Sequence, residues 1–107
     1  MPAKKFAAKS IPVNNWEEIM VTNDGFDTTI TVHLSNHSDS DAKVSLAILE
    51  QSTLQVVNHD VFQLNQLVYK GDSRQFPGIV LEAGHKLMAT SSYPGVTILV
   101  YGYEEEI

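Results

Sequence analysis

The chain has 107 residues, of which 43% are apolar and 19% are charged, a balance typical of a globular protein. Since a single domain typically has about 100–150 residues, we expect one domain spanning residues 1–107. The absence of cysteine excludes disulfide bonds, zinc sites with cysteine ligands and thiol nucleophiles. The net charge of −6 disfavours nonspecific binding to nucleic acid or to an anionic membrane, because both would repel an anionic protein.

No segment has the apolar length that a targeting signal or a membrane span requires. Near the start of the chain the apolar stretch between the lysines is only residues 6–8. A signal peptide needs an apolar core of about 7–15 residues, and a spanning helix needs about 20. We therefore expect a protein that is made in the cytoplasm and either stays there or assembles there into a larger structure.

The first part of the chain predicts two strands. Residues 5–11 are expected to form a strand that ends at Pro12, so residues 1–12 are either an N-terminal arm or an edge strand. Residues 16–22 predict a second strand. Asn23-Asp24-Gly25 follows it, and Asp-Gly suits the tight turn of a hairpin.

Residues 26–35 show the strongest alternation of apolar and polar side chains. Phe26, Ile30 and Leu34 fall on one face of the predicted strand, and polar residues occupy the other face. Residues 36–41 form a polar turn whose side chains can bond to the backbone, and residues 43–48 alternate again. We expect these two strands to form a hairpin joined by the 36–41 loop.

The middle of the chain is ambiguous. Residues 58–60 (Asn-His-Asp) are a turn signal between two short apolar runs, and residues 66–69 predict either a short strand or a loop. A helix over residues 61–68 is an open alternative, because Val61, Leu64 and Val68 have helical spacing.

In the last third of the chain, the sequence predicts a short apolar run over residues 78–81 and a strand over 85–90. A turn at 91–95 and a final strand over 96–103 follow. The final segment is apolar on both faces, which predicts either a central strand or a strand whose outer face meets a partner. About seven or eight short strands separated by turns predict an all-β fold, a single antiparallel β-sandwich of jelly-roll or immunoglobulin-like type.

Candidate catalytic and metal-binding groups do not converge in the sequence. His33 and His37 are four residues apart, but we place His33 on a strand and His37 in a turn, and the acidic residues after them lack the other ligands of a calcium loop. His59 and Asp60 would point to opposite faces if they lay in a strand. We expect no enzymatic activity, no metal and no cofactor.

Aromatic side chains and oppositely charged ends are the candidate contacts for a partner. The basic residues near the start and the acidic residues near the end are expected to pair, either within the sheet or between neighbouring copies. Trp16 and the tyrosines are candidate interface anchors or, in an alternative interpretation, a carbohydrate-stacking face. The predicted interface residues are Lys4, Lys5, Lys9, Trp16, Tyr101, Tyr103, Glu104, Glu105 and Glu106.

Three segments carry a resemblance to a known class of proteins. Residues 77–87 (PGIVLEAGHKL), residues 96–105 (VTILVYGYEE) and residues 8–16 (AKSIPVNNW) resemble small structural proteins of tailed bacteriophages. The resemblance implies a non-enzymatic virion component, located on the capsid surface, at the neck or in the tail and fibre region. It also implies symmetric copies, with the trimer as the commonest arrangement.

The leading hypothesis is a capsid decoration (cement) protein that is located in the virion and binds the outer surface of the particle. Its partners would then be the major capsid protein and further copies of itself, without nucleic acid or membrane. The alternatives are a protein that binds tail, neck or fibre components and a carbohydrate-binding adhesion module.

Overall fold

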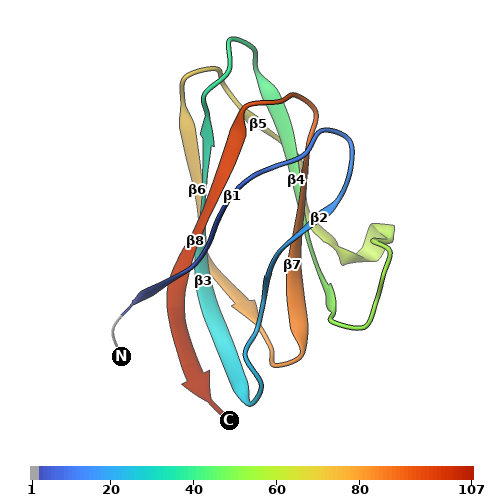
Figure 1. Cartoon of the computed structure of the whole chain (residues 1–107), viewed down its shortest axis with the longest axis vertical. Coiled ribbons are helices and arrows are strands. Elements are labelled where there is room, and N and C mark those ends of the chain that lie inside the picture. Colours follow the sequence, from blue (N-terminus) through green and yellow to red (C-terminus); the bar gives the residue numbers. More distant parts are fainter. Residues whose placement is uncertain (1–2) are drawn as a thin grey trace.

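The computed structural model describes residues 3–107 and consists of two four-stranded sheets packed face to face (Figure 1). Sheet A has the order β1 (Lys4–Ser10), β8 (Val96–Glu106), β3 (Phe26–Asn36), β6 (Ser73–Leu81). Sheet B has the order β2 (Glu17–Val21), β7 (His85–Ser91), β4 (Ala42–Glu50), β5 (Val61–Val68). All neighbouring strands in both sheets are antiparallel. The predicted all-β antiparallel sandwich is confirmed.

The strand order distinguishes between the two predicted types of sandwich. The first strand pairs with the last, β2 pairs with β7, β3 with β6 and β4 with β5. This is the pairing of one long hairpin, which is rolled up so that β8 also pairs with β3 and β7 with β4. An eight-stranded double sheet with this wiring is a jelly roll.

The predicted hairpin between residues 26–35 and 43–48 is wrong, because β3 lies in sheet A and β4 lies in sheet B. The buried Asn36 side chain explains the crossing. Its amide donates to the carbonyl oxygens of Ser40 and Val68, each at 2.9 Å, and its oxygen accepts the N–H of Ser38 at 2.9 Å. Since Val68 ends β5 of sheet B, these bonds hold the end of β3 against the opposite sheet.

The predicted Asn23-Asp24-Gly25 turn forms, but it does not close a hairpin. Gly25 has a φ of 79°, a conformation that glycine adopts without steric strain. Just before the turn, Thr22 N–H donates to the His85 carbonyl of sheet B at 3.1 Å. The turn therefore connects β2 of sheet B to β3 of sheet A.

The middle of the chain is β-structure, so the alternative of a helix over 61–68 is wrong. Residues 61–68 form β5, an edge strand whose register shifts relative to β4. These shifts interrupt the alternation of its side chains, which is why its apolar residues have helix-like spacing. A 3-10 turn at Asn58–Asp60 precedes β5.

The short apolar run predicted at residues 78–81 is the end of β6. The first half of β6 is polar, so the sequence did not predict it as a strand. Within residues 3–107, no helix has the length and hydrophobicity to cross a bilayer.

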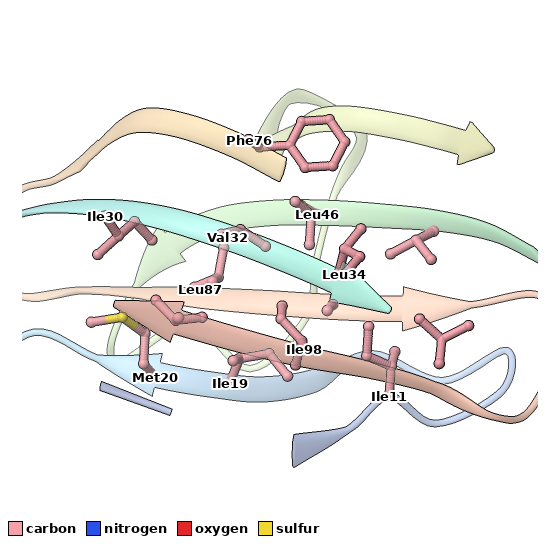
Figure 2. Close-up of a cluster of buried hydrophobic side chains, with 14 of the residues drawn as sticks. Ile11, Ile19, Met20, Ile30, Val32, Leu34, Leu46, Phe76, Leu87 and Ile98 are labelled. Atoms are coloured by element: carbon pink, nitrogen blue, oxygen red, sulfur yellow. The ribbon is translucent and has the colours of Figure 1, made fainter. Parts of the chain in front are cut away.

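The main core lies between the sheets, and the inward faces of the alternating strands form it (Figure 2). Ile30, Val32 and Leu34 of β3 meet Leu46 and Leu87 of sheet B there. Replacing one such buried leucine by alanine costs about 2–5 kcal/mol in a well-packed core.

A second, smaller apolar cluster lies on the outer face of sheet B. Ala47, Leu49 and Met88 are buried there, and side chains from the segments on either side of the sheet pack over them. The covering side chains are Trp16, Val56 and Val61. This cover explains why β4 has buried residues on both faces.

Candidate functional site

The outer face of sheet A carries an apolar stripe on β8, formed by Leu99, Tyr101 and Tyr103. These residues alternate with the buried Val100 and Gly102, so they point away from the core. Tyr103 is 50% exposed, and Val80 on β6 of the same sheet is 58% exposed. The sequence prediction of a central strand is confirmed, because β8 lies between β1 and β3.

A shallow depression of about 470 Å³ adjoins this stripe, bounded by β1, β3 and β8. His33 on its floor lies 3.1 Å from the side-chain nitrogen of Gln75, and His37 lies 3.1 Å from the Thr97 hydroxyl. In the part of the chain that the structure describes, no three His, Cys, Asp or Glu side chains are grouped as metal ligands. The depression offers hydrogen-bonding groups beside an apolar surface.

The oppositely charged ends meet within one chain. Lys4 forms an ion pair with Glu104, and the Asn23 amide donates to the other carboxylate oxygen of Glu104. The hydrogen bonds from Lys4 and Asn23 lower the pKa of the Glu104 carboxyl below its ordinary value. Lys9 instead donates to the Glu18 carbonyl of sheet B at 2.9 Å.

The predicted interface residues do not form one continuous surface. Lys5 pairs in register with Tyr101, and Glu105 pairs with Asp27, so these residues flank the stripe on the outer face of sheet A. Trp16 packs on the outer face of sheet B, away from Tyr101. Tyr69 and Tyr93 lie in turns, apart from Tyr101 and Tyr103 on β8. Residues 3–107 therefore provide no single aromatic face. Glu106, the last residue of β8, is exposed.

His59 and Asp60 lie in the 3-10 turn and not in a strand, so the expected divergence of their side chains does not apply. The His59 ring nitrogen is 3.6 Å from the Asp60 carboxylate, but the His59 side chain is 86% exposed. The other carboxylate oxygen accepts the N–H of Val57 at 3.0 Å. This carboxylate caps the turn, and the pair has no enclosed site around it.

A second depression, which the sequence did not reveal, lies on the outer face of sheet B. We call it the Trp16 pocket; its volume is about 180 Å³. Its walls come from four segments that are far apart in the sequence. The spacing of residues along the chain therefore could not predict the pocket. The lining residues include Asn14, Trp16, Lys43, Ser45, Asn65 and Thr90.

The chain matches no family model, and a search of curated proteins found no similar sequence. The fold, the chemistry of these surfaces and the resemblance of the three sequence segments are therefore the grounds for a functional proposal.

Proposed function

We propose that this protein is a structural subunit of a bacteriophage virion, a decoration protein that binds the major capsid protein on the outside of the particle. The segments 77–87 and 96–105 support it through their resemblance to small phage structural proteins. The jelly roll supports it by analogy, since this fold recurs in viral capsid proteins. Because the same fold also occurs in proteins with other functions, the surface of this protein is stronger evidence for its function than the fold.

The apolar stripe on β8 is the observation that carries the proposal. An antiparallel sheet with one face in water normally alternates apolar and polar residues along each strand. Leu99, Tyr101 and Tyr103 break this alternation on a face that stays partly exposed. Because aromatic residues are enriched at protein interfaces, we assign the outer face of sheet A to the capsid contact.

The net charge of the protein favours a location on the outside of the capsid shell. A net charge of −6 repels packaged DNA, and the stripe itself is bordered by Lys5 on one strand and by the Asp27–Glu105 pair farther along. Charges of both signs at the rim orient a docking partner more than they add affinity. We propose a trimer on the particle, because the resemblance to small phage structural proteins implies this arrangement. Contacts between copies would also stabilise a small domain.

The direct test adds the purified protein to phage heads that lack decoration. Binding should be visible by co-sedimentation, and it should raise the melting temperature of the heads. A Tyr101→Thr/Tyr103→Thr double variant should keep its fold, because threonine suits strands, and should lose most of the binding. Tyr69→Thr is the matched control, since Tyr69 is 57% exposed and lies outside sheet A.

Two results would contradict the proposal. Binding to isolated tails or fibres without binding to heads would assign the protein to that part of the virion. Equal binding by the wild type and the double variant would remove the stripe on β8 from the contact.

A further inference from the structure

We propose that the Trp16 pocket binds a single sugar ring, with preference for a sugar that carries a carboxylate. This site lies on sheet B, whereas the proposed capsid contact lies on sheet A, so the two proposals can fail separately.

The pocket begins where the apolar cover of sheet B ends. On the outer face, the paired residues Ala47 and Met88 belong to the covered cluster. The next outward pair along the same strands is Ser45 and Thr90, which line the pocket. Trp16 belongs to both regions, because it packs against the cluster and forms a wall of the pocket.

Two residues with unusual backbone conformations lie in this pocket. Asn14 has a φ of 58° and Asn65 a φ of 48°, and they are the two non-glycine residues with positive φ among residues 3–107. Such conformations are sparsely populated and cluster at functional sites. Asn65 sits in the irregular part of β5, and its N–H donates to the Ser45 hydroxyl at 2.9 Å. Asn14 is fixed by its N–H, which donates to the Ser91 carbonyl at 2.9 Å.

The walls offer polar groups with unused hydrogen-bonding capacity. The buried Ser45 hydroxyl accepts the Asn65 N–H, which leaves its own proton free to donate. The Ser92 hydroxyl accepts the Lys43 N–H at 2.9 Å in the same way. The Thr90 hydroxyl oxygen is buried and has no partner in residues 3–107. A buried hydroxyl without a partner is unfavourable. Because this oxygen is closed off from solvent, a ligand hydroxyl would bind it only after a rotation of the Thr90 side chain.

This combination of groups fits a sugar ring. An indole face can cover the apolar C–H side of a pyranose, while amides and hydroxyls bind its hydroxyl groups. A volume of about 180 Å³ is smaller than a pocket for a drug-sized ligand and suits one ring. The ammonium of Lys43 has no ion-pair partner within the described chain, and it would favour a carboxylate on the sugar.

The chain has one tryptophan, so its fluorescence reports directly on this pocket. We would titrate the protein with glucose, galactose, mannose, N-acetylglucosamine, glucuronic acid and sialic acid. The expected result is a saturable fluorescence change with at least one sugar, and tighter binding of an acidic sugar than of a neutral one. A flat response to all six sugars would overturn the proposal.

Glycine variants test the assignment without changing the backbone. Asn14→Gly and Asn65→Gly keep the positive φ and remove the side-chain amides, so each should weaken binding by about tenfold. Asn15→Ala is the matched control, because Asn15 is exposed and its amide bonds to Val13 outside the pocket. Unchanged binding by both glycine variants would overturn the proposal. The Tyr101→Thr/Tyr103→Thr variant should bind the sugar normally.

Discussion

The ammonium of Lys4 and the carboxylate of Glu104 form an ion pair that joins edge strand β1 to β8 at one end of the sandwich. Asn23 binds the second oxygen of the same carboxylate, so the turn between β2 and β3 is attached to the same point. Three segments from the beginning, the first quarter and the end of the chain are thus held by one acidic side chain.

Acid should weaken this junction. Because the pKa of Glu104 is lowered in the folded protein, its charged form stabilises the fold at neutral pH, and this contribution is lost as the pH falls through the lowered pKa. Unfolding by urea at a series of pH values should show a smaller loss of stability below pH 4.5 for Glu104→Gln than for the wild type. Glu106→Gln is the control, and an identical acid dependence of Glu104→Gln and the wild type would refute the role of the carboxylate.

Gly102 should be the glycine most sensitive to substitution. A Cβ at this position would lie 2.0 Å from the Thr29 carbonyl oxygen and 2.9 Å from the Ile30 Cα, both on the neighbouring strand β3. We expect Gly102→Ala to lower the free energy of unfolding by about 3 kcal/mol, because the backbone has to move. Gly71→Ala, with open space around its Cβ but a φ of 73°, should cost only about 1 kcal/mol. Denaturant unfolding measures both, and a smaller loss for Gly102→Ala would contradict the close approach.

Asn36 should be essential for the crossing between the sheets. Asn36→Ala leaves the carbonyl of Val68 and the N–H of Ser38 without their side-chain partner, so we expect a loss of about 3 kcal/mol. Asn36→Asp should also destabilise, because a carboxylate cannot donate to the two carbonyls that the amide now binds. Thermal unfolding checks both variants. A melting temperature of Asn36→Asp equal to that of the wild type would show that the donor bonds are dispensable.

We expect the buried cation Lys86 to be dispensable for the fold. It is 6% exposed, and its ammonium lies 3.7 Å from the Glu18 carboxylate, too far for a hydrogen bond. Replacing a buried charge by an apolar side chain of similar size is often neutral or stabilising, so Lys86→Met should keep or raise the free energy of unfolding by about 1 kcal/mol. Lys70→Met, on an exposed turn, is the control. A clear loss of stability in Lys86→Met alone would assign Lys86 a structural role.

The regular parts of the fold followed from side-chain alternation. The alternation from Phe26 to Ser35 predicted a strand with one buried face, and its inward residues Ile30, Val32 and Leu34 belong to the core between the sheets. Side-chain alternation could not predict which sheet the chain enters after each turn. Residues 36–41 and 23–25 have ordinary turn chemistry. The sheet that follows each turn depends on contacts between distant segments, such as the bonds from Asn36 to Val68 and from Thr22 to His85.

The surfaces were harder to predict than the strands. The double-sided apolar pattern of residues 96–103 indicated a central strand, and its outward tyrosines mark the proposed contact. The Trp16 pocket had no comparable signal, because Asn14, Ser45, Asn65 and Thr90 come from four segments that only the folded sheet brings together. The positive φ values of the two asparagines are not visible in the sequence, since most asparagines adopt other conformations.

The pairing of β1 with β8 sets the order in which the molecule can be completed during synthesis. β1 is made first, yet its neighbour in sheet A is made last, and β3 also waits for that strand on one side. Among the strands of residues 3–107, only β4 and β5 are both consecutive in the chain and paired in a sheet. The ribosome therefore releases most of the chain before most strands find their neighbours. Such distant pairings make folding slow and leave strand edges open to other chains for longer. A nascent chain of this protein therefore has a period of vulnerability to aggregation that ends only when β8 enters between β1 and β3.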